Sequence, residues 1–461
     1  MLTKTLQIDQ LKTINLLELN RLLRKLQTKT SELETLFKAA TAGGKEEPPV
    51  PPIVDFGDSP NLDAFDRLRV SEPLTVFDAQ FQYDASPLLW ETTATVASAT
   101  HNANASTVTL ALTSTDTAQS VLRQSYEYVH HQPGKSQLLL MTFNFVDATI
   151  PAEVTKEVGY GDDANGLFLV QTGNGIVLRL RSSVSGAPVD TDVLQGLWNI
   201  DNMDGSGPSG ILLDWSKVQL LAIDFEWLGG GRVRYCFIID GMIYPVHEVL
   251  NANATSSTYM GTPNLPVRYK LSKTSGTSTA TLLQISASVL TEGGTDLVTG
   301  HPFSISNGLT PISITTRRAL LSIRPKATFG TLTNRCSIEP ESFSLGTSSA
   351  ATQMVYYELV YNPTYTTGAG ALTWTSASAN SATEYSVHGD ANAGTFTGGE
   401  VILSGYVPSS ITGRIEIFKT ILSKLPIALD SAGANPKAIA LVCTATGATS
   451  CYGSFNWVEY R

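Results

Sequence analysis

The segment that decides the fold class is Arg232–Leu250, RVRYCFIIDGMIYPVHEVL. The apolar runs FII and MIY flank Asp240-Gly241, and an Asp-Gly pair in that position is a strong signal for a tight β-hairpin turn. Upstream, Lys217–Leu228, KVQLLAIDFEWL, has the apolar and aromatic composition of another strand, and Leu228–Arg232, LGGGR, has that of a turn. The stretch therefore predicts consecutive strands joined by tight turns.

The same pattern continues on both sides of this segment. Short apolar runs and period-two alternation predict further strands at Leu138–Val146, Gly166–Gln171, Gly175–Ser182, Arg318–Pro325, Gln353–Pro363, Gly399–Val407 and Ala438–Thr446. Amphipathic helices do not alternate with these runs, which argues against a doubly wound α/β fold. We predict an all-β protein, with a sandwich or jelly roll over residues 61–305 and a second β-domain over residues 306–461.

The first 40 residues are the one strongly helical stretch and contain neither Gly nor Pro. Alternating three- and four-residue steps form a heptad seam whose one polar member is Thr30. Its apolar members are Leu16, Leu19, Leu23, Leu26, Leu33 and Phe37. We predict that these are the oligomerisation residues of an α-helical coiled coil, and the wide apolar stripe favours a homotrimer. Docking on another protein and packing on the chain's own sandwich are the two alternatives.

Residues 41–60 predict a linker between this helix and the β-body. Gly43 and Gly44 end the helix, and Pro48-Pro49 and Pro51-Pro52 favour an extended, semi-rigid spacer. A spacer separates the helix from the sandwiches, which argues against the helix packing on its own domain.

The charge of the chain is low and unevenly distributed. Only 16% of the 461 residues are charged and the net charge is −10, yet the first 40 residues carry seven Lys/Arg against four acidic residues. An acidic body does not neutralise phosphates, so we exclude nucleic acid as a partner. Because no apolar run reaches the length of a membrane-spanning helix and no signal-peptide pattern is present, we expect no membrane insertion and a protein made in a cytosol.

Four cysteines are too few for a disulfide scaffold, and their spacing does not match a zinc site. Cys443 and Cys451 could face each other across a hairpin with the loop TATGATS. Two buried free thiols are the interpretation that we favour.

One pair of carboxylates has the spacing that a glycosidase requires. Asp224 and Glu226 lie on one face of a predicted strand, about 6.6–6.8 Å apart along the backbone. We favour a different interpretation, in which both acids face solvent and pair with Arg232 or Arg234 across the turn. We therefore predict a protein that is not an enzyme and has no catalytic residues.

The candidate metal sites are weak. In NIDNMDGSG, Asp201, Asp204 and Gly205 suggest a calcium loop, but the alternating oxygen ligands and distant Glu of an EF-hand are missing, which favours an Asx-rich turn. His130-His131 and His247 have no ligand spacing around them. We predict no metal and no cofactor.

Two long segments resemble virion structural proteins of tailed bacteriophages. One is Asn61–Glu91, NLDAFDRLRVSEPLTVFDAQFQYDASPLLWE. The other is Ser182–Asn253, which contains WNIDNMDGSGPSGILLDWSK and LLAIDFEWLGGGRVRYCFIIDGMIYPVHEVLNAN, followed by YMGTPNLPVRY at Tyr259–Tyr269. Such proteins are capsid fibres, decoration proteins or tail-associated proteins, so the resemblance implies a lectin-like (concanavalin-like) β-sandwich carried on a particle. It transfers no catalytic residue to this chain.

These features lead us to expect a non-enzymatic structural component of a bacteriophage virion, made in the bacterial host cytoplasm. A homotrimeric fibre or decoration protein would bind capsid, neck or tail proteins through its N-terminal segment and expose its β-domains. The alternative is a tail-associated receptor-binding protein that recognises host-surface glycans. A glycan-degrading enzyme that rests on Asp224 and Glu226 is the third hypothesis.

Overall fold

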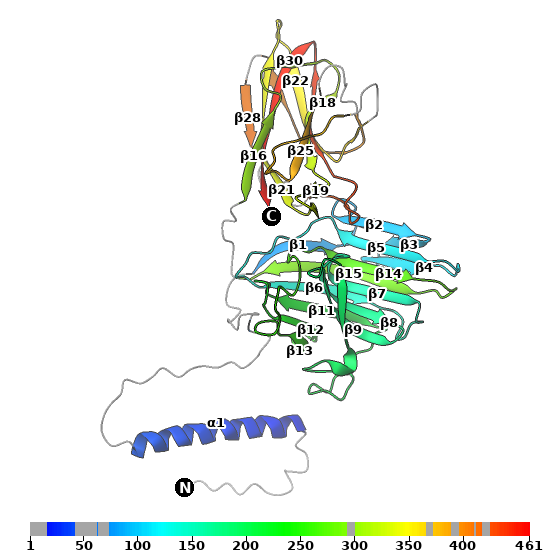
Figure 1. Ribbon diagram of the computed structural model, residues 1–461, viewed down its shortest axis with the longest axis vertical. Helices are drawn as coiled ribbons and strands as arrows, with labels where there is room; N and C mark the ends of the chain where they lie inside the picture. Colours follow the sequence, from blue (N-terminus) through cyan, green and yellow to red (C-terminus); the bar gives the residue numbers. More distant parts are fainter. Residues whose placement is uncertain are drawn as a thin grey trace. The chain divides into compact units, whose positions relative to one another are not determined.

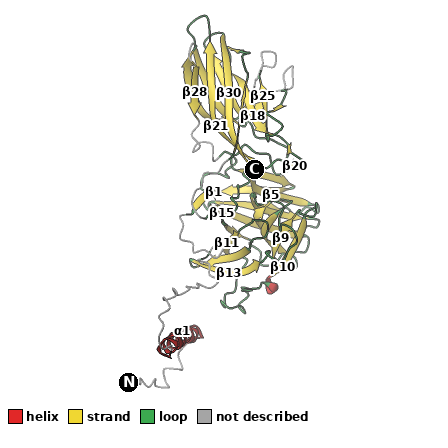
Figure 2. Ribbon diagram, turned by 60° about the vertical axis from the view of Figure 1, so that its left-hand side comes forward, coloured by secondary structure: helices red, strands yellow, loops and turns green. Residues whose placement is uncertain are grey.

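A computed structural model describes the protein over residues 16–41, 62, 73–292, 300–365, 372–388, 396–409, 412–416 and 425–461. The chain divides into two units, Met1–Gly57 and Asp58–Arg461. Among the described residues one α-helix accompanies many antiparallel strands (Figure 2), which confirms the predicted all-β class. Within the same ranges, no helix has the length and apolar character needed to cross a membrane.

The first sandwich consists of two large antiparallel sheets (Figure 1). Sheet 1 has the order β13-β12-β11-β6-β15-β4-β3, with β1 also paired to β15, and sheet 2 has the order β10-β9-β8-β7-β14-β5-β2. Sheet 1 contains β1 (Leu74–Gln80), β3 (Ala97–Asn102), β4 (Thr107–Leu112), β6 (Gln137–Asn144), β11 (Val218–Phe225), β12 (Val233–Ile239), β13 (Met242–Val249) and β15 (Thr281–Thr291). Sheet 2 contains β2 (Trp90–Thr95), β5 (Gln119–Ser125), β7 (Val154–Gly161), β8 (Gly166–Thr172), β9 (Gly175–Ser182), β10 (Val189–Leu194) and β14 (Val267–Lys273).

The hairpin predicted at Asp240-Gly241 joins β12 to β13 in sheet 1. Both turn residues have positive φ, 52° for Asp240 and 78° for Gly241, as a two-residue type I′ turn requires. Such a turn twists in the same sense as the strands it joins, so the local sequence fixes this pairing without help from distant residues.

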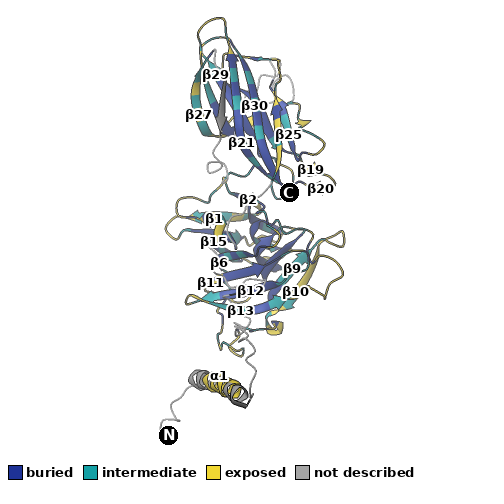
Figure 3. Ribbon diagram, turned by 90° about the vertical axis from the view of Figure 1, so that its left-hand side faces the viewer, coloured by how far each residue is buried: buried dark blue, intermediate teal, exposed yellow. Residues whose placement is uncertain are grey.

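Strand β6 shows how the first core is built. Its residues alternate between buried and half-buried, so Leu139, Met141 and Phe143 join the core between the sheets. Figure 3 shows the buried strand faces in dark blue. Trp215 is buried in this core and Trp227 packs against it.

The second sandwich is formed by the strands that follow β15. Sheet 3 has the order β16-β30-β21-β28, with β17 also paired to β30, and sheet 4 has the order β24-β25-β18-β29-β22-β27. Sheet 3 contains β16 (His301–Ser306), β17 (Ile312–Ile314), β21 (Ser337–Ser348), β28 (Thr412–Glu416) and β30 (Thr449–Tyr460). Sheet 4 contains β18 (Arg318–Pro325), β22 (Met354–Tyr361), β24 (Thr375–Ser376), β25 (Thr383–Val387), β27 (Glu400–Pro408) and β29 (Ile439–Ala445). Two short ribbons pair β19 (Thr328–Phe329) with β20 (Leu332–Thr333) and β23 (Thr364–Tyr365) with β26 (Phe396–Thr397).

Two sequence-based expectations about this sandwich have different outcomes. The strand predicted at Gln353–Pro363 is confirmed as β22, which is hydrogen-bonded on both sides, to β27 and β29, as suits a strand with two largely apolar faces. The idea that Cys443 and Cys451 face each other across a hairpin is wrong, because β29 belongs to sheet 4 and β30 to sheet 3. The chain between these strands crosses from one sheet to the other. Both thiols are free and buried, as we favoured.

The N-terminal unit contains α1 (Leu16–Thr41), a helix of 26 residues. Within it, the side chains described are those of residues 23–35. In the single chain Leu23, Leu26 and Leu33 are 51%, 66% and 67% exposed. The side chains of Leu16, Leu19 and Phe37 lie outside the described residues. The helix is thus present, while the coiled coil and the trimer remain predictions.

Candidate functional site

The carboxylate pair predicted as a possible catalytic site has a structural role at Asp224. This residue faces Arg234 across β11 and β12, and its Oδ2 lies 2.9 Å from Arg234 Nη2. The two side chains are 2% and 1% exposed, and Arg234 also donates a hydrogen bond to the carbonyl of Leu62. The predicted pairing with Arg234 is confirmed, but the expectation that the acid faces solvent is wrong.

Glu226 is also buried, at 3% exposure. Its carboxylate packs so tightly against Gly231 that a Cβ on this glycine would lie 1.9 Å from Glu226 Oε2. A general acid or base must reach the proton that it transfers, within hydrogen-bond distance of the substrate. Asp224 is enclosed with Arg234, whereas Glu226 is largely buried and borders a hollow together with Arg232.

The acidic loop at residues 201–209 is held together by its own carboxylates. Asp201 accepts hydrogen bonds from the backbone N–H groups of Met203 (2.8 Å) and Ser209 (2.7 Å), and Asp204 accepts from Ser206. These contacts confirm the predicted Asx-rich turn. Within the described ranges, no group of three or more His, Cys, Asp or Glu residues is arranged to hold a metal.

His130 and His131 are placed in and beside the core. His131 is 2% exposed and stacks on Phe225 with ring centroids 5.6 Å apart. Burial, followed by the charge of His130, lowers the pKa of His131 to about 4, because a charged imidazole is poorly solvated there. The ring is therefore neutral over the physiological range.

Two neighbouring hollows that combine apolar walls with polar groups lie at one end of the first sandwich. There the terminal strands β10 of sheet 2 and β13 of sheet 1 leave an opening, which we call the edge pocket. Its volume is about 450 Å³, within the range of small-molecule sites. The lining residues used below are Leu178, Leu180, Val193, Tyr235, His247, Asn251 and Tyr259. A second hollow of about 590 Å³, lined in part by Glu226 and Arg232, shares Leu250 and Asn251 with the edge pocket.

The wall formed by β9 and β10 follows from strict alternation in both strands. In GIVLRLRS, Leu178 and Leu180 face the pocket, while Arg179 and Arg181 face the other side of sheet 2. There Arg179 contacts Asp192 at 2.7 Å and Arg181 contacts Asp190 at 2.7 Å, each through its Nε atom. These cross-strand ion pairs hold the edge strand β10 in register, and so place Val193 in the pocket.

The aromatic part of the pocket is fixed by hydrogen bonds to the backbone. The Tyr235 hydroxyl donates to the carbonyl of Arg179 (3.1 Å), and the Tyr259 hydroxyl donates to the carbonyl of Glu226 (3.0 Å). Burial raises the pKa of both phenols above the usual value, so both hydroxyls stay protonated as donors. The two rings are thus held rigidly against the pocket.

Polar atoms lie beside the tyrosines, since His247 in β13 is the cross-strand partner of Tyr235 in β12. His247 Nδ1 accepts a hydrogen bond from the backbone N–H of Asn199 (3.1 Å), which leaves the proton of the neutral ring on Nε2. Burial lowers the pKa of His247 and favours this neutral form. Asn251 donates through Nδ2 to the carbonyl of Gly231 (2.7 Å). To the described residues, neither His247 Nε2 nor Asn251 Oδ1 makes a hydrogen bond, so the pocket offers one donor and one acceptor.

Sequence reasoning missed the edge pocket as a site. It found no ligand spacing around His247, and the structure shows that one ring nitrogen accepts a hydrogen bond while the ring lines a cavity. The signal available in the sequence was charge complementarity. Two arginines stand two positions apart in GIVLRLRS, and two acidic residues stand two positions apart in Val189–Leu194. That match indicates the β9–β10 pairing but not which strands of sheet 1 lie opposite.

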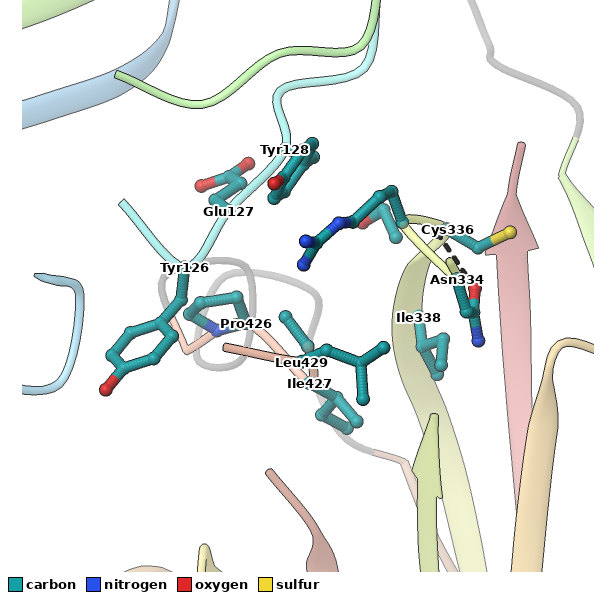
Figure 4. Close-up of a pocket in the computed structure, with 12 residues that line it drawn as sticks. Tyr126, Glu127, Tyr128, Asn334, Cys336, Ile338, Pro426, Ile427 and Leu429 are labelled. Atoms are coloured by element: carbon teal, nitrogen blue, oxygen red, sulfur yellow. Dashed lines mark hydrogen bonds between the residues drawn. The ribbon is translucent and has the colours of Figure 1, made fainter. Parts of the chain in front are cut away.

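A smaller pocket lies where residues of the two sandwiches meet inside the unit Asp58–Arg461 (Figure 4). Tyr126, Glu127 and Tyr128 line it from one side, and Ile427 and Leu429 line it from the other. Its volume is about 20 Å³, enough for one water molecule and too small for an organic ligand. Burial, with a contribution from the negative charge of Glu339, raises the pKa of Glu127 to about 8. This pocket is therefore a contact between sandwiches and not a ligand site.

Neither a family model nor a curated protein sequence matches the chain. Solved structures with similar regions include a legume lectin-like domain from Entamoeba histolytica, which is 11% identical with a TM-score of 0.29, covering 49% of this chain and 100% of that chain. An endo-1,3-β-glucanase from Streptomyces sioyaensis is 8% identical with a TM-score of 0.34, covering 48% of this chain and 97% of that chain. A carbohydrate esterase from the Shiga toxin-encoding bacteriophage phi24B is 12% identical with a TM-score of 0.27, covering 48% and 100%. At these values nothing about activity or ligand follows from the similarities.

Proposed function

We propose that this protein is a non-enzymatic structural component of a bacteriophage virion that binds a neutral saccharide in the edge pocket. The observation that carries the binding proposal is the composition of this pocket, which two fixed tyrosine rings and aliphatic side chains line together with His247 and Asn251. Apolar walls with a few placed polar groups are the usual construction of a small-ligand site. Tyrosine rings pack against the apolar faces of a sugar, while hydroxyl groups use the donor and the acceptor.

The electrostatics of the pocket favour an uncharged ligand. Glu248 lines the pocket, but its Oε2 lies 3.6 Å from Arg232 Nη1, so the acid has a cation beside it. His247 is neutral because burial lowers its pKa. A saccharide with hydroxyl groups fits this balance better than an anion or a cation.

The binding experiment measures affinity directly by calorimetry with neutral oligosaccharides prepared from the host surface. Val193→Trp fills the pocket and is expected to abolish binding, while His247→Ala and Asn251→Ala each remove one polar contact and weaken binding about tenfold. The matched control is Leu332→Trp, on a residue of the second sandwich that is 74% exposed, and it leaves the affinity unchanged. Equal affinities in all four variants would reject the pocket as the site.

The virion part of the proposal rests on the N-terminal unit and on the resemblance of the β-body to phage structural proteins. Leu23, Leu26 and Leu33 form an exposed apolar row on α1 in the single chain, and such a row is buried when helices associate. The segment is basic while the rest of the chain is acidic, which suits attachment by the N-terminal end. Binding to capsid, neck or tail proteins and exposure of the sandwiches follow from this arrangement.

Light scattering on the full-length protein tests association. We expect a trimer for the natural sequence and a monomer when all three leucines are replaced by Ser. Replacement of Arg24, Lys25 and Lys29 by Ser is the control on the same helix turns and leaves the trimer intact. A monomeric natural protein at micromolar concentration contradicts self-association, and labelling of intact particles then decides between attachment to another virion protein and absence from the particle.

The enzymatic alternative has a direct test as well. Because Asp224 is engaged with Arg234 and Glu226 is buried, we expect no cleavage of host glycans by the intact protein. Product formation that disappears in Glu226→Gln, while saccharide binding is retained, would establish the enzyme instead.

A further inference from the structure

The second sandwich contains two cysteines that face each other across its core. Cys443 lies in β29 of sheet 4 and Cys451 lies in β30 of sheet 3. Each side chain is 0% exposed, and both belong to the cluster of buried residues that joins the two sheets. The short connection between Ala445 and Thr449 brings the chain from one sheet to the other, so the two cysteines lie close to the same bend.

The two cysteine side chains interact inside this core. The Cys451 thiol donates a hydrogen bond to the carbonyl of Thr449 at 3.8 Å. The interaction between the two cysteines lowers the pKa of Cys451 and raises that of Cys443. Cys451 is thus the more acidic thiol of the pair.

We propose that Cys443 and Cys451 are a latent inter-sheet disulfide, which forms when the folded protein meets a small-molecule disulfide. Proteins that leave a reducing cytosol meet such conditions. Both cysteines are free in the structure, so the proposal concerns a modification that the fold permits.

The chemistry is thiol–disulfide exchange. The Cys451 thiolate attacks one sulfur of oxidised glutathione, forms a mixed disulfide and expels one glutathione thiolate. The Cys443 thiol then loses its proton and attacks the Cys451 sulfur, which breaks the mixed disulfide and releases the second glutathione. Two protein thiols lose two electrons and two protons, and one glutathione disulfide is reduced to two thiols.

The bond would tie sheet 3 to sheet 4 next to the bend. A cross-link that closes a short loop restricts the unfolded chain, and we expect the thermal midpoint of the second sandwich to rise by about 5 °C. The other two cysteines do not share this geometry. Cys236 lies in β12 of the first sandwich, and Cys336 is half-buried next to β21, with its pKa raised to about 11 by burial.

The test uses full-length protein incubated with oxidised glutathione, then denatured, alkylated and digested without reduction. We expect a linked peptide that contains Cys443 and Cys451, a mass lower by two hydrogen atoms, and a midpoint that returns to its starting value with dithiothreitol. Cys236→Ala is the matched control and keeps both the link and the shift. Cys443→Ala loses both and instead carries one glutathione on Cys451, which reports that the oxidant reaches this sulfur.

Three results would overturn the proposal. The first is glutathione on Cys451 in Cys443→Ala without any link in the natural sequence, because the sulfurs would then be reachable but wrongly placed. The second is no reaction at either sulfur in both proteins, because the fold would then keep the pair reduced. The third is a link that involves Cys236 or Cys336.

Discussion

Glu91 in β2 accepts two hydrogen bonds from Ser431, one from its backbone N–H at 2.6 Å and one from its hydroxyl at 2.9 Å. These residues are far apart in sequence and belong to different sandwiches. Beside them the Arg335 guanidinium lies over the Tyr128 ring at 4.5 Å, and Lys437 Nζ lies over the Tyr126 ring at 3.8 Å. The contact between the sandwiches is thus made by charged and aromatic groups.

Replacing Glu91 by Ala should loosen this contact more than replacing Ser431 by Ala. The first change leaves the Ser431 N–H without its acceptor and costs about 1–3 kcal/mol, whereas the second keeps the backbone bond and costs about 1 kcal/mol. Limited proteolysis between the sandwiches and calorimetry measure the effect. Glu400→Ala, at an exposed carboxylate in β27 of the second sandwich, is the control, and equal protease resistance in all three proteins would show that the bond contributes little.

Glu127 should make stability fall as the pH rises. Its pKa is about 8 in the folded protein against about 4.5 in an unfolded chain, so between these values the folded state holds a proton that the unfolded state has lost. The stabilising difference is complete below pH 4.5 and is lost as the pH approaches 8. Because the side chain is only half-buried, we expect a loss of about 2 kcal/mol.

Glu127→Gln removes this titration while keeping the shape of the side chain. We expect urea unfolding between pH 5 and about pH 9 to show that the free energy of unfolding of the natural protein falls, relative to that of the variant, as the pH rises. If the difference in free energy of unfolding between the two proteins is the same at every pH in this range, Glu127 is ionised in the folded state at neutral pH.

His131 and His388 should make the stability of the folded protein fall as the pH falls, which is the opposite of the effect of Glu127. Burial lowers the pKa of each ring to about 4, whereas an unfolded histidine titrates near 6.5. As the pH falls from 6.5 toward 4, each histidine becomes protonated in the unfolded chain but stays neutral in the folded protein. The free energy of unfolding therefore falls by up to about 3 kcal/mol for each residue. Below pH 4 the folded rings also become charged, and this dependence ends.

Substitution of one histidine at a time separates the two contributions. His131→Leu keeps an apolar group against Phe225 and should remove one part of the acid dependence, measured by urea unfolding between pH 4 and 7. His388→Asn should remove another part, although it also loses the 2.7 Å contact with Ser322 Oγ and lowers stability at neutral pH. An unchanged acid slope in both variants would assign the dependence to other groups.

The Asp224–Arg234 pair should behave as a buried structural pair. Asp224→Ala leaves the guanidinium in the interior without its carboxylate and should destabilise the first sandwich by about 3–5 kcal/mol. The double variant Asp224→Leu with Arg234→Met removes both charges and should recover most of that loss. Chemical denaturation of the three proteins measures the difference, and a double variant no more stable than the single one would argue for a role beyond charge compensation.

The parts of the fold that depend on neighbouring residues were predictable from sequence. The turn at Asp240-Gly241 needs two residues with positive φ, and its pairing needs no distant partner. The central position of β22 followed from the apolar residues on both of its faces. Period-two alternation shows which residues share a face of a strand, and this was enough to predict where the strands lie.

Alternation does not show which sheet a strand joins. The buried ion pair, the edge pocket and the cysteine pair all depend on which strands lie next to or opposite one another. Asp224 was expected in solvent because its face is polar in sequence, but Arg234 and the backbone of Leu62 enclose it. Tyr235 and Leu180 meet in one pocket because β12 and β9 end up in opposite sheets. Cys443 and Cys451 were placed on one hairpin for the same reason, since their spacing fits both a hairpin and a crossing between sheets.

Strand β30 imposes an order on the synthesis of this protein. It pairs with β16 on one side and β21 on the other, so the innermost strand of sheet 3 is the last one to be translated. Strand β16 leaves the ribosome about 140 residues earlier, which is roughly 10–30 s at bacterial elongation rates. During that delay the pairing edge of β16 is open to wrong pairings. The first sandwich meets the same demand at β15, which pairs with β1 although about 200 residues separate the two strands.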